Sequence, residues 1–344
     1  MHTASLRPIA LCALLALAVP SLWALPSHYH VTDLGALSIG KQIAPGGKVA
    51  GIDASGFVLK PAVFVHGKPH LRANPFQEGI VHGLNDAGVA VGEVGNPNFR
   101  HAVVWHGASE MLDIGQLLGT DHSVATAVDA DGDCTVDGQF GNENVSYLIP
   151  GCNGTRVLIN IGSLGGVQTF TTAINAARQV TGMSATPAVA ARQGMHAFLY
   201  SQGSMHDLGV LPGDNESQGL GLNDLGHVVG ESGSDSNHGR GFFHDGQAMR
   251  AIGTFGGTSS LAFGVNHDDV VVGMAADAMN RFHAFIVDER NHGELIDLQS
   301  LLDESGDSFV LTQALGINDA GQILASALGP NDAFARAVVL TPDD

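Results

Sequence analysis

Residues 129–133 (DADGD) alternate carboxylates with small residues, which is the pattern that opens a calcium-binding loop. Such a loop also needs a bidentate acid at its twelfth position, and Phe140 stands there instead. The run occupies a place in the chain where other segments carry an Asn-Asp-x-Gly turn. We therefore expect a hairpin turn at residues 129–133, with weak calcium binding as the alternative.

The chain contains 17 histidines, whose imidazole nitrogens are common metal ligands. A metal site would need several of them to converge on one point. His101, His196 and His283 instead begin apolar runs in three separate copies of a repeat. We expect these histidines to cap strands and to hydrogen-bond locally, and we predict neither a metal site nor another cofactor.

Acidic residues number 34, and two carboxylates on one face could act as general acid and base. However, Asp33, Asp113, Asp207 and Asp297 recur at one position of the repeat, which indicates a structural role in every copy. The sequence contains no Gly-x-Ser-x-Gly nucleophile elbow, phosphate-binding loop or Cys–His nucleophile signature. We therefore predict no catalytic residue.

Residues 1–24 have the pattern of a signal peptide, because Arg7 precedes an apolar stretch and Ala24 suits the last position before cleavage. The stretch is too short to span a bilayer comfortably. We expect export to the periplasm or the extracellular medium, no membrane insertion after cleavage, and a single domain over residues 25–344.

Cys134 and Cys152 are the two cysteines that remain once Cys12 leaves with the signal peptide. An exported chain is oxidised, so an even number of cysteines favours pairing. Cys134 begins the strand after the turn at residue 129, and Cys152 follows the next strand. Antiparallel pairing of those strands would bring the two sulfurs within bridging reach, so we predict a disulfide between them.

The formal net charge is −19, although charged residues make up only 14% of the chain. A protein that acidic repels phosphate backbones and anionic lipid. We therefore expect neither nucleic acid nor a bare membrane as a partner. An extracellular protein or glycan remains possible, and we expect the protein to be a monomer.

A turn of the Asn-Asp-x-Gly type recurs along the chain and must join short strands. The turns begin at positions 44, 85, 129, 175, 223, 266 and 318, with spacings of 41 to 52 residues. The spacing is typical of four-stranded propeller blades. The residues that we assign to these structural turns are Asn85, Gly88, Asn175, Asn223, Gly226, Asn266, Asn318 and Gly321.

The fold predicted from this repeat is all-β, a seven-bladed β-propeller of four-stranded antiparallel blades. Radial packing buries both faces of each blade against its neighbours and leaves only short edges. Residues 29–35 match the fourth strand of the unit, whereas residues 335–340 match the third. We therefore predict that the N-terminal strand pairs with the C-terminal strand and completes the seventh blade.

The recurring elements resemble the HAF repeats of probable extracellular bacterial proteins. The triplet is intact at residues 196–198 and 283–285, and residues 101–103 (HAV) are close to it. Pro61, Val145, Gly241 and Arg336 stand at the histidine position of the other copies. The resemblance covers nearly all of residues 25–344 and implies an extracellular repeat protein, but it supplies no catalytic residues.

These observations favour an exported, non-catalytic binding or scaffolding propeller whose ligand is unknown. The alternative is a lyase or hydrolase that acts on extracellular polysaccharide, with its site on one propeller face. Loops that differ between blades would carry such a site. The polar segment 288–307, which belongs to the longest repeat, is the part that we expect to form a functional rim.

Overall fold

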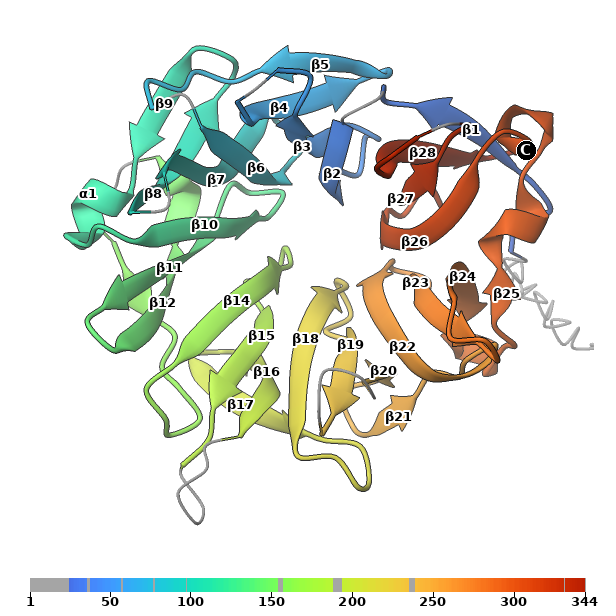
Figure 1. Ribbon diagram of the computed structural model, residues 1–344. Coiled ribbons are helices and arrows are strands. Elements are labelled where there is room, and N and C mark those ends of the chain that lie inside the picture. The colour runs from blue at the N-terminus through green and yellow to red at the C-terminus, as the bar shows by residue number, and fades with distance from the viewer. Residues whose placement is uncertain are drawn as a thin grey trace, which may run out of the picture.

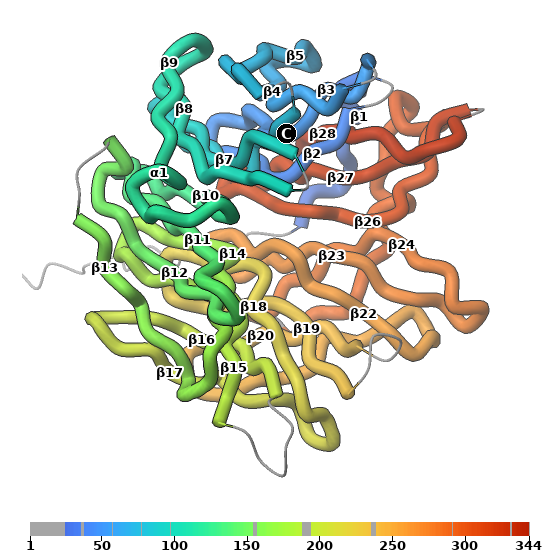
Figure 2. The backbone as a smooth tube through the Cα atoms, turned by 60° about the vertical axis from the view of Figure 1, so that its left-hand side comes forward, coloured from blue at the N-terminus to red at the C-terminus, as the bar shows by residue number. Residues whose placement is uncertain are grey.

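The computed structural model describes residues 25–343 except 36–37, 57, 77, 97, 154–156, 188–193, 235–238 and 331. The predicted signal peptide lies outside the described residues. Seven four-stranded antiparallel sheets surround a central axis, as Figure 1 shows nearly along that axis. In Figure 2 the chain passes from sector to sector around the ring until its last strands lie beside its first ones. The prediction of a seven-bladed propeller is confirmed.

Each of the first six blades uses four consecutive strands, ordered from the axis outward. Blade 1 contains β2 (Ser38–Ile43), β3 (Val49–Asp53), β4 (Lys60–Val65) and β5 (Lys68–Leu71). Blade 2 contains β6 (Gly79–Leu84), β7 (Val89–Asn96), β8 (Phe99–His106) and β9 (Glu110–Asp113). Blade 3 contains β10 (Ser123–Val128), β11 (Cys134–Phe140), β12 (Glu143–Ile149) and β13 (Ile159–Asn160).

The second half of the ring repeats this order. Blade 4 contains β14 (Thr169–Ile174), β15 (Val180–Ala185), β16 (Met195–Ser201) and β17 (Ser204–Gly209). Blade 5 contains β18 (Glu216–Leu222), β19 (Val228–Gly233), β20 (Arg240–His244) and β21 (Met249–Ala251). Blade 6 contains β22 (Gly256–Val265), β23 (Val270–Asp277), β24 (Phe282–Asp288) and β25 (Ile296–Asp297). Blade 7 contains β26 (Val310–Ile317), β27 (Ile323–Leu328), β28 (Arg336–Pro342) and β1 (Tyr29–Asp33).

Helical structure among the described residues is confined to short pieces. The four-residue helix α1 (Gly115–Leu118) lies in the link from blade 2 to blade 3. The 3-10 turns are η1 (Pro150–Cys152), η2 (Glu289–Asn291), η3 (Leu298–Leu301) and η4 (Glu304–Gly306). None of these described helices is long and apolar enough to cross a membrane.

The predicted Asn-Asp-x-Gly turns join the first strand of a blade to the second. Asn85 shows how one works: its Oδ1 accepts a hydrogen bond from the backbone N of Val89 at 3.0 Å. Gly88 closes the same turn with a φ of 86°, a conformation that favours glycine. The Nδ2 of Asn85 donates to the carbonyl oxygen of Asp129 in the next blade, at 2.9 Å. The turn therefore links two blades as well as two strands.

The same blade-to-blade bond is present at three further junctions, whereas Nδ2 of Asn266 has no partner among the described residues. Asn175 donates to the carbonyl of Asn223, Asn223 to that of Asn266, and Asn318 to that of Ala44. In three turns the aspartate that follows the first residue of the turn bonds to the preceding blade. The carboxylates of Asp86, Asp224 and Asp319 accept hydrogen bonds from backbone N–H groups there. We call this set of turns the Asn belt. These hydrogen bonds between blades explain why asparagine and aspartate recur in the turns.

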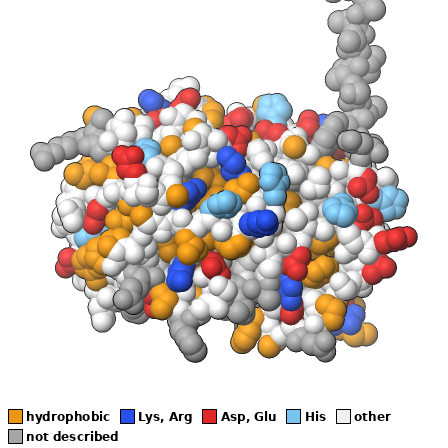
Figure 3. All heavy atoms as spheres, turned by 90° about the horizontal axis from the view of Figure 1, so that it is seen from above, with side chains coloured by type: hydrophobic (Ala, Val, Ile, Leu, Met, Phe, Trp, Pro, Cys, Tyr) orange, Lys and Arg blue, Asp and Glu red, His pale blue; other side chains and the backbone are white. Residues whose placement is uncertain are grey.

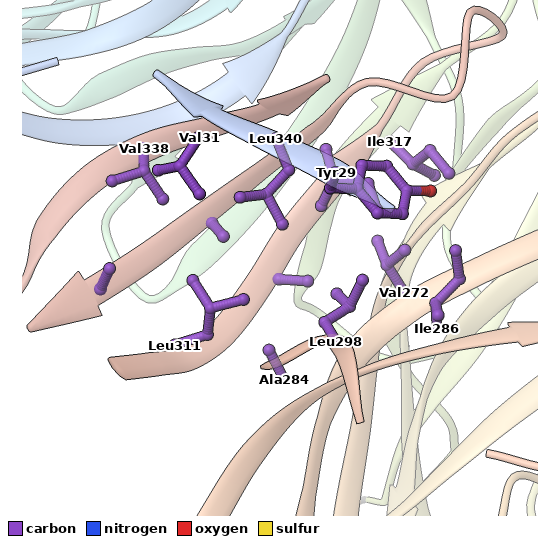
Figure 4. Close-up of a cluster of buried hydrophobic side chains, with 14 of the residues drawn as sticks. Tyr29, Val31, Val272, Ala284, Ile286, Leu298, Leu311, Ile317, Val338 and Leu340 are labelled. Carbon is purple, nitrogen blue, oxygen red and sulfur yellow. The ribbon is translucent and has the colours of Figure 1, made fainter. Parts of the chain in front are cut away.

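The N-terminal strand closes the ring as predicted. Strand β1 pairs antiparallel with β28 over five positions, from Tyr29 opposite Pro342 to Asp33 opposite Val338. Figure 4 shows Tyr29 and Val31 among side chains of blades 6 and 7, including Leu340. The side chain of Tyr29 is fully buried. Two segments about three hundred residues apart in sequence thus share one hydrophobic core.

Candidate functional site

The predicted disulfide joins Cys134 and Cys152, whose Cα atoms are 5.8 Å apart. Cys134 begins β11 opposite Ile149, and Cys152 follows in η1, so the antiparallel pair positions both sulfurs as expected. Both cysteines are fully buried in the core of blade 3. The bond is therefore a structural one.

The calcium-like run at residues 129–133 forms a turn of the Asn belt. Oδ1 of Asp129 accepts from the backbone N of Asp131 and of Asp133, at 3.0 and 2.8 Å. The carboxylate of Asp133 accepts from the backbone N of Gly151 and pairs with Arg178 of blade 4. The expectation of a hairpin turn is confirmed, and these contacts leave the carboxylates directed at different partners.

The histidine of each HAF-like triplet pairs with the aspartate of the same blade's Asp-Leu-Gly-like element. The Nδ1–carboxylate distances are 2.8 Å for His101 and Asp113, 3.0 Å for His196 and Asp207, and 2.8 Å for His283 and Asp297. These residues lie on the third and fourth strands, or at their ends, so each pair ties the outer strand to its blade. The expected local hydrogen bonding is confirmed.

Segment 288–307 does not form one rim. Its first part, with η2, lies in the turn between the third and fourth strands of blade 6, and its second part, with η3 and η4, forms the link to blade 7. In that link the backbone N of Asp303 donates to the carbonyl of Tyr29 at 3.0 Å. Oγ of Ser305 accepts from the backbone N of Val31 at 2.7 Å. The link therefore holds the closing strand β1.

Equivalent positions of the seven blades differ in chemistry around the central channel. The first strand of every blade contains a β-bulge at the same place, where the residue three positions before the turn has no partner on the second strand. All seven unpaired residues line a cavity of about 180 Å³ on the axis. In ring order they are Lys41, His82, Thr126, Thr172, Leu220, Phe263 and Leu315.

This bulge ring is polar on one side and apolar on the other. Blades 1 to 4 contribute the ammonium of Lys41, the imidazole of His82 and two threonines, whereas blades 5 to 7 contribute Leu220, Phe263 and Leu315. The hydroxyls of Thr126 and Thr172 already hydrogen-bond to Thr171 and to the carbonyl of Gly219, each in the next blade. A ligand in the channel would therefore meet the ammonium of Lys41 on this side and apolar surface on the other. Such mixed lining is typical of small-molecule sites.

His82 is neutral at physiological pH. Burial, together with the positive charges of Lys41 and Arg100, lowers the pKa of His82 to about 4. Its Nε2 atom is buried and has no hydrogen-bond partner among the described residues. A ring with this pKa and no exposed Nε2 is a poor general base.

A second cavity, of about 230 Å³, lies between blades 4 and 5. Two carboxylates, Glu216 and Glu231, line it together with Met183 and Met195. Burial raises the pKa of Glu231, and Gln218 donates a hydrogen bond to its Oε2 at 3.1 Å. A smaller cavity, of about 90 Å³, also contains two carboxylates, Glu78 and Glu93, but there Arg100 pairs with Glu93.

Sequence reasoning missed the bulge ring, although a signal for it exists. Each bulge residue stands three positions before the start of its turn: His82 precedes Asn85, and Phe263 precedes Asn266. The residue at this position of the repeat varies from lysine in blade 1 to phenylalanine in blade 6, whereas the turn that follows it recurs. A position that varies within a regular repeat is free of the repeat's structural demands and is available for binding.

No protein-family model matches the chain. No curated protein matches it either. Among solved structures, the chain is similar to the β-propeller domain of the Trilobed protease from Pyrococcus furiosus, which is described as having an open velcro topology. The TM-score is 0.58 at 9% identity, and the match covers 93% of this chain and 95% of that one.

Two further solved structures are longer than this chain. The acylaminoacyl peptidase from Pyrococcus horikoshii matches with a TM-score of 0.50 and 11% identity, over 86% of this chain and 51% of the peptidase. TolB from Acinetobacter baumannii matches with a TM-score of 0.44 and 12% identity, over 62% of this chain and 53% of TolB. The chain thus spans about half the length of either protein. At these identities the likeness to the two Pyrococcus propellers shows the fold alone.

Proposed function

We propose that this protein is an exported, non-catalytic propeller that binds a small extracellular ligand, such as the end of a glycan, in its central channel. The observation that carries the proposal is the two-sided bulge ring. The seven bulge residues occupy equivalent places in the fold, yet those of blades 1 to 4 are polar and those of blades 5 to 7 are apolar. The pairing of the strands does not require this division.

The chemistry of the ring suits a sugar. Phe263 of blade 6 offers an aromatic ring to the apolar face of a pyranose, and Lys41 of blade 1, two blades further round the ring, offers a hydrogen-bond donor. The cavity of about 180 Å³ is smaller than most drug-sized sites, so it would admit one small group rather than a whole chain. The low pKa and buried Nε2 of His82 favour binding over proton transfer.

A glycan array probed with residues 25–344 tests the proposal. We expect selective binding that Phe263→Ala weakens by about tenfold, because an aromatic contact at a small site supplies on the order of 1 kcal/mol or more. Phe334→Ala is the matched control, since Phe334 is 77% exposed and does not line the channel. Absence of binding, or equal losses for the two variants, would refute the channel site.

A hydrolase is the second candidate, and the cavity between blades 4 and 5 supports it. Two carboxylates, one with a raised pKa, are the minimum for glycoside hydrolysis. A polysaccharide panel measured by release of reducing ends tests this function. Turnover that Glu231→Gln abolishes would establish the enzyme and displace the non-catalytic proposal.

Export is part of the proposal, and it is supported by the predicted signal peptide and by the buried disulfide, which suits an oxidising compartment. The resemblance to HAF repeats agrees with it. Mass spectrometry of the protein from its native host should find a mature N-terminus near Leu25. An intact Met1 in the cytosolic fraction would contradict export.

A further inference from the structure

Positive charge in this acidic protein is concentrated in blade 1. All four lysines of the chain belong to residues 38–71, and Asp53 is the only acidic residue in that range. The four are Lys41, Lys48, Lys60 and Lys68. Figure 3 looks onto the edge of the ring at the top of Figure 1, where β4 and β5 lie, and basic and histidine side chains gather in the middle of that view.

A cavity of about 290 Å³ opens beside the outer part of this blade, at the start of β4 and the end of β5. Its polar lining consists of Lys60, Arg72 and Asn74. The described residues of the lining include no carboxylate, and their remaining surface comes from Val58, Pro61 and Leu71. Cationic and amide donors therefore face apolar walls.

Two of the donors are buried and unused. Nε of Arg72 and Nδ2 of Asn74 have no hydrogen-bond partner among the described residues. Oδ1 of Asn74 accepts from the backbone N of Phe76 at 2.9 Å, which fixes the orientation of the amide. Buried donors without partners cost about 1–3 kcal/mol each, so such groups are normally satisfied by an ordered water or by another bound group.

The guanidinium of Arg72 also lacks a nearby carboxylate in the described structure. Burial alone lowers its pKa, without an opposing contribution from an acid. Asp53 is the closest acid in the strand register, because it lies opposite Lys60. Its carboxylate accepts from the backbone N of Ser55 at 2.9 Å and does not line the cavity.

We propose that this blade-1 cavity binds a small organic carboxylate with an apolar body, held by Lys60, Arg72 and Asn74. A guanidinium and a fixed amide suit a planar oxyanion, and the apolar walls suit a short aliphatic group. The carboxylate could come from a free acid or from the C-terminus of a peptide. The site is separate from the central channel, so it does not depend on the function proposed above.

Titration calorimetry with N-acetylleucine and with N-acetylleucinamide tests the site. The two probes share an apolar body and differ in the carboxylate, so we expect binding of the acid and at least tenfold weaker binding of the amide. A peptide that ends in a free Leu carboxylate distinguishes the two sources. Tighter binding of the peptide than of N-acetylleucine indicates a peptide terminus, and weaker binding indicates a free acid.

Two variants that each remove one positive charge distinguish specific binding in the cavity from nonspecific electrostatic attraction of the negatively charged probe to blade 1. Arg72→Met should weaken binding of N-acetylleucine by tenfold or more, because a bond to a charged group is lost. Lys68→Met removes the same charge from the same blade outside the cavity and should change the affinity less than twofold. Circular dichroism and thermal melting confirm that both variants are folded. Equal affinities for acid and amide, or equal losses for the two variants, would overturn the proposal.

Discussion

Removing the aromatic ring of Tyr29 should destabilise the whole propeller, because this side chain anchors the strand that closes the ring. Tyr29 is fully buried, and an aromatic-to-alanine change in a core costs about 3–5 kcal/mol. Its hydroxyl is buried without a partner among the described residues, which lessens its native contribution by about 1 kcal/mol. Tyr29→Ala should therefore cost about 2–4 kcal/mol, a large share of the stability of an ordinary domain.

Two controls on the same strand make the measurement specific. Tyr29→Phe removes only the unpaired hydroxyl and should be neutral or stabilising by about 1 kcal/mol. His30→Ala removes an exposed contact with Asp303 and should cost less than about 1 kcal/mol.

Urea denaturation of residues 25–344 gives the three free energies of unfolding from the midpoint and slope. Deletion of residues 25–34 should also expose the edge of β28 and promote aggregation. If Tyr29→Ala unfolds at the same midpoint as His30→Ala, then β1 does not hold the ring together and the closure argument fails.

Three further changes test the other structural elements. Replacing Cys134 and Cys152 with alanine should lower the free energy of unfolding by about 3 kcal/mol, measured in urea, because the disulfide closes a loop of 18 residues. Asn223→Ala should cost about 2 kcal/mol, whereas a loss below about 0.5 kcal/mol would show that the Asn belt does not couple blades. Asp129→Asn should stabilise the protein, since the Nδ2 of the new asparagine could donate to the carbonyl of Asn175, as Asn85 and Asn223 do to the next blade. Burial raises the pKa of Asp129 from 3.8 to about 6, so its favourable protonated form is fully present below about pH 4 and is lost as the pH rises through 6. The advantage of Asp129→Asn over the wild type in urea titrations should therefore grow between about pH 4 and pH 7, and a constant difference would contradict the raised pKa.

The blade count and the closure of the ring could be predicted because the repeat places a turn residue and an apolar run at fixed offsets. The turn at Asn85 predicts both the hairpin and its position between the first two strands. The bulge ring could not be predicted in the same way. An alternating pattern assigns His82 to one face of a regular strand, whereas the bulge between Val81 and Gly83 shifts the register and directs His82 to the channel.

The polar segment 288–307 shows a different limit of sequence reasoning. Its many acids suggested a solvated functional loop, but Leu298 is fully buried in the core that β1 completes. Closure accounts for the second part of this segment, because the link from β25 to β26 contacts a strand that comes from the other end of the chain. A local reading of composition cannot reveal a partner that lies almost the whole sequence away.

Blade 7 shows how the repeat adapts to that closure. In blades 2, 4 and 6 the histidine of the third strand pairs with an aspartate of the fourth strand in the same stretch of chain, as His196 does with Asp207. In blade 7 the equivalent pair is Arg336 and Asp33, 2.8 Å apart, which belong to the two ends of the chain. Arginine keeps its charge at every physiological pH and can engage two carboxylates at once, as it does here with Asp33 and Asp332. Arginine thus replaces histidine in blade 7, the junction where a permanent charge is most useful, since there no turn connects the outer strand to the third strand of its blade.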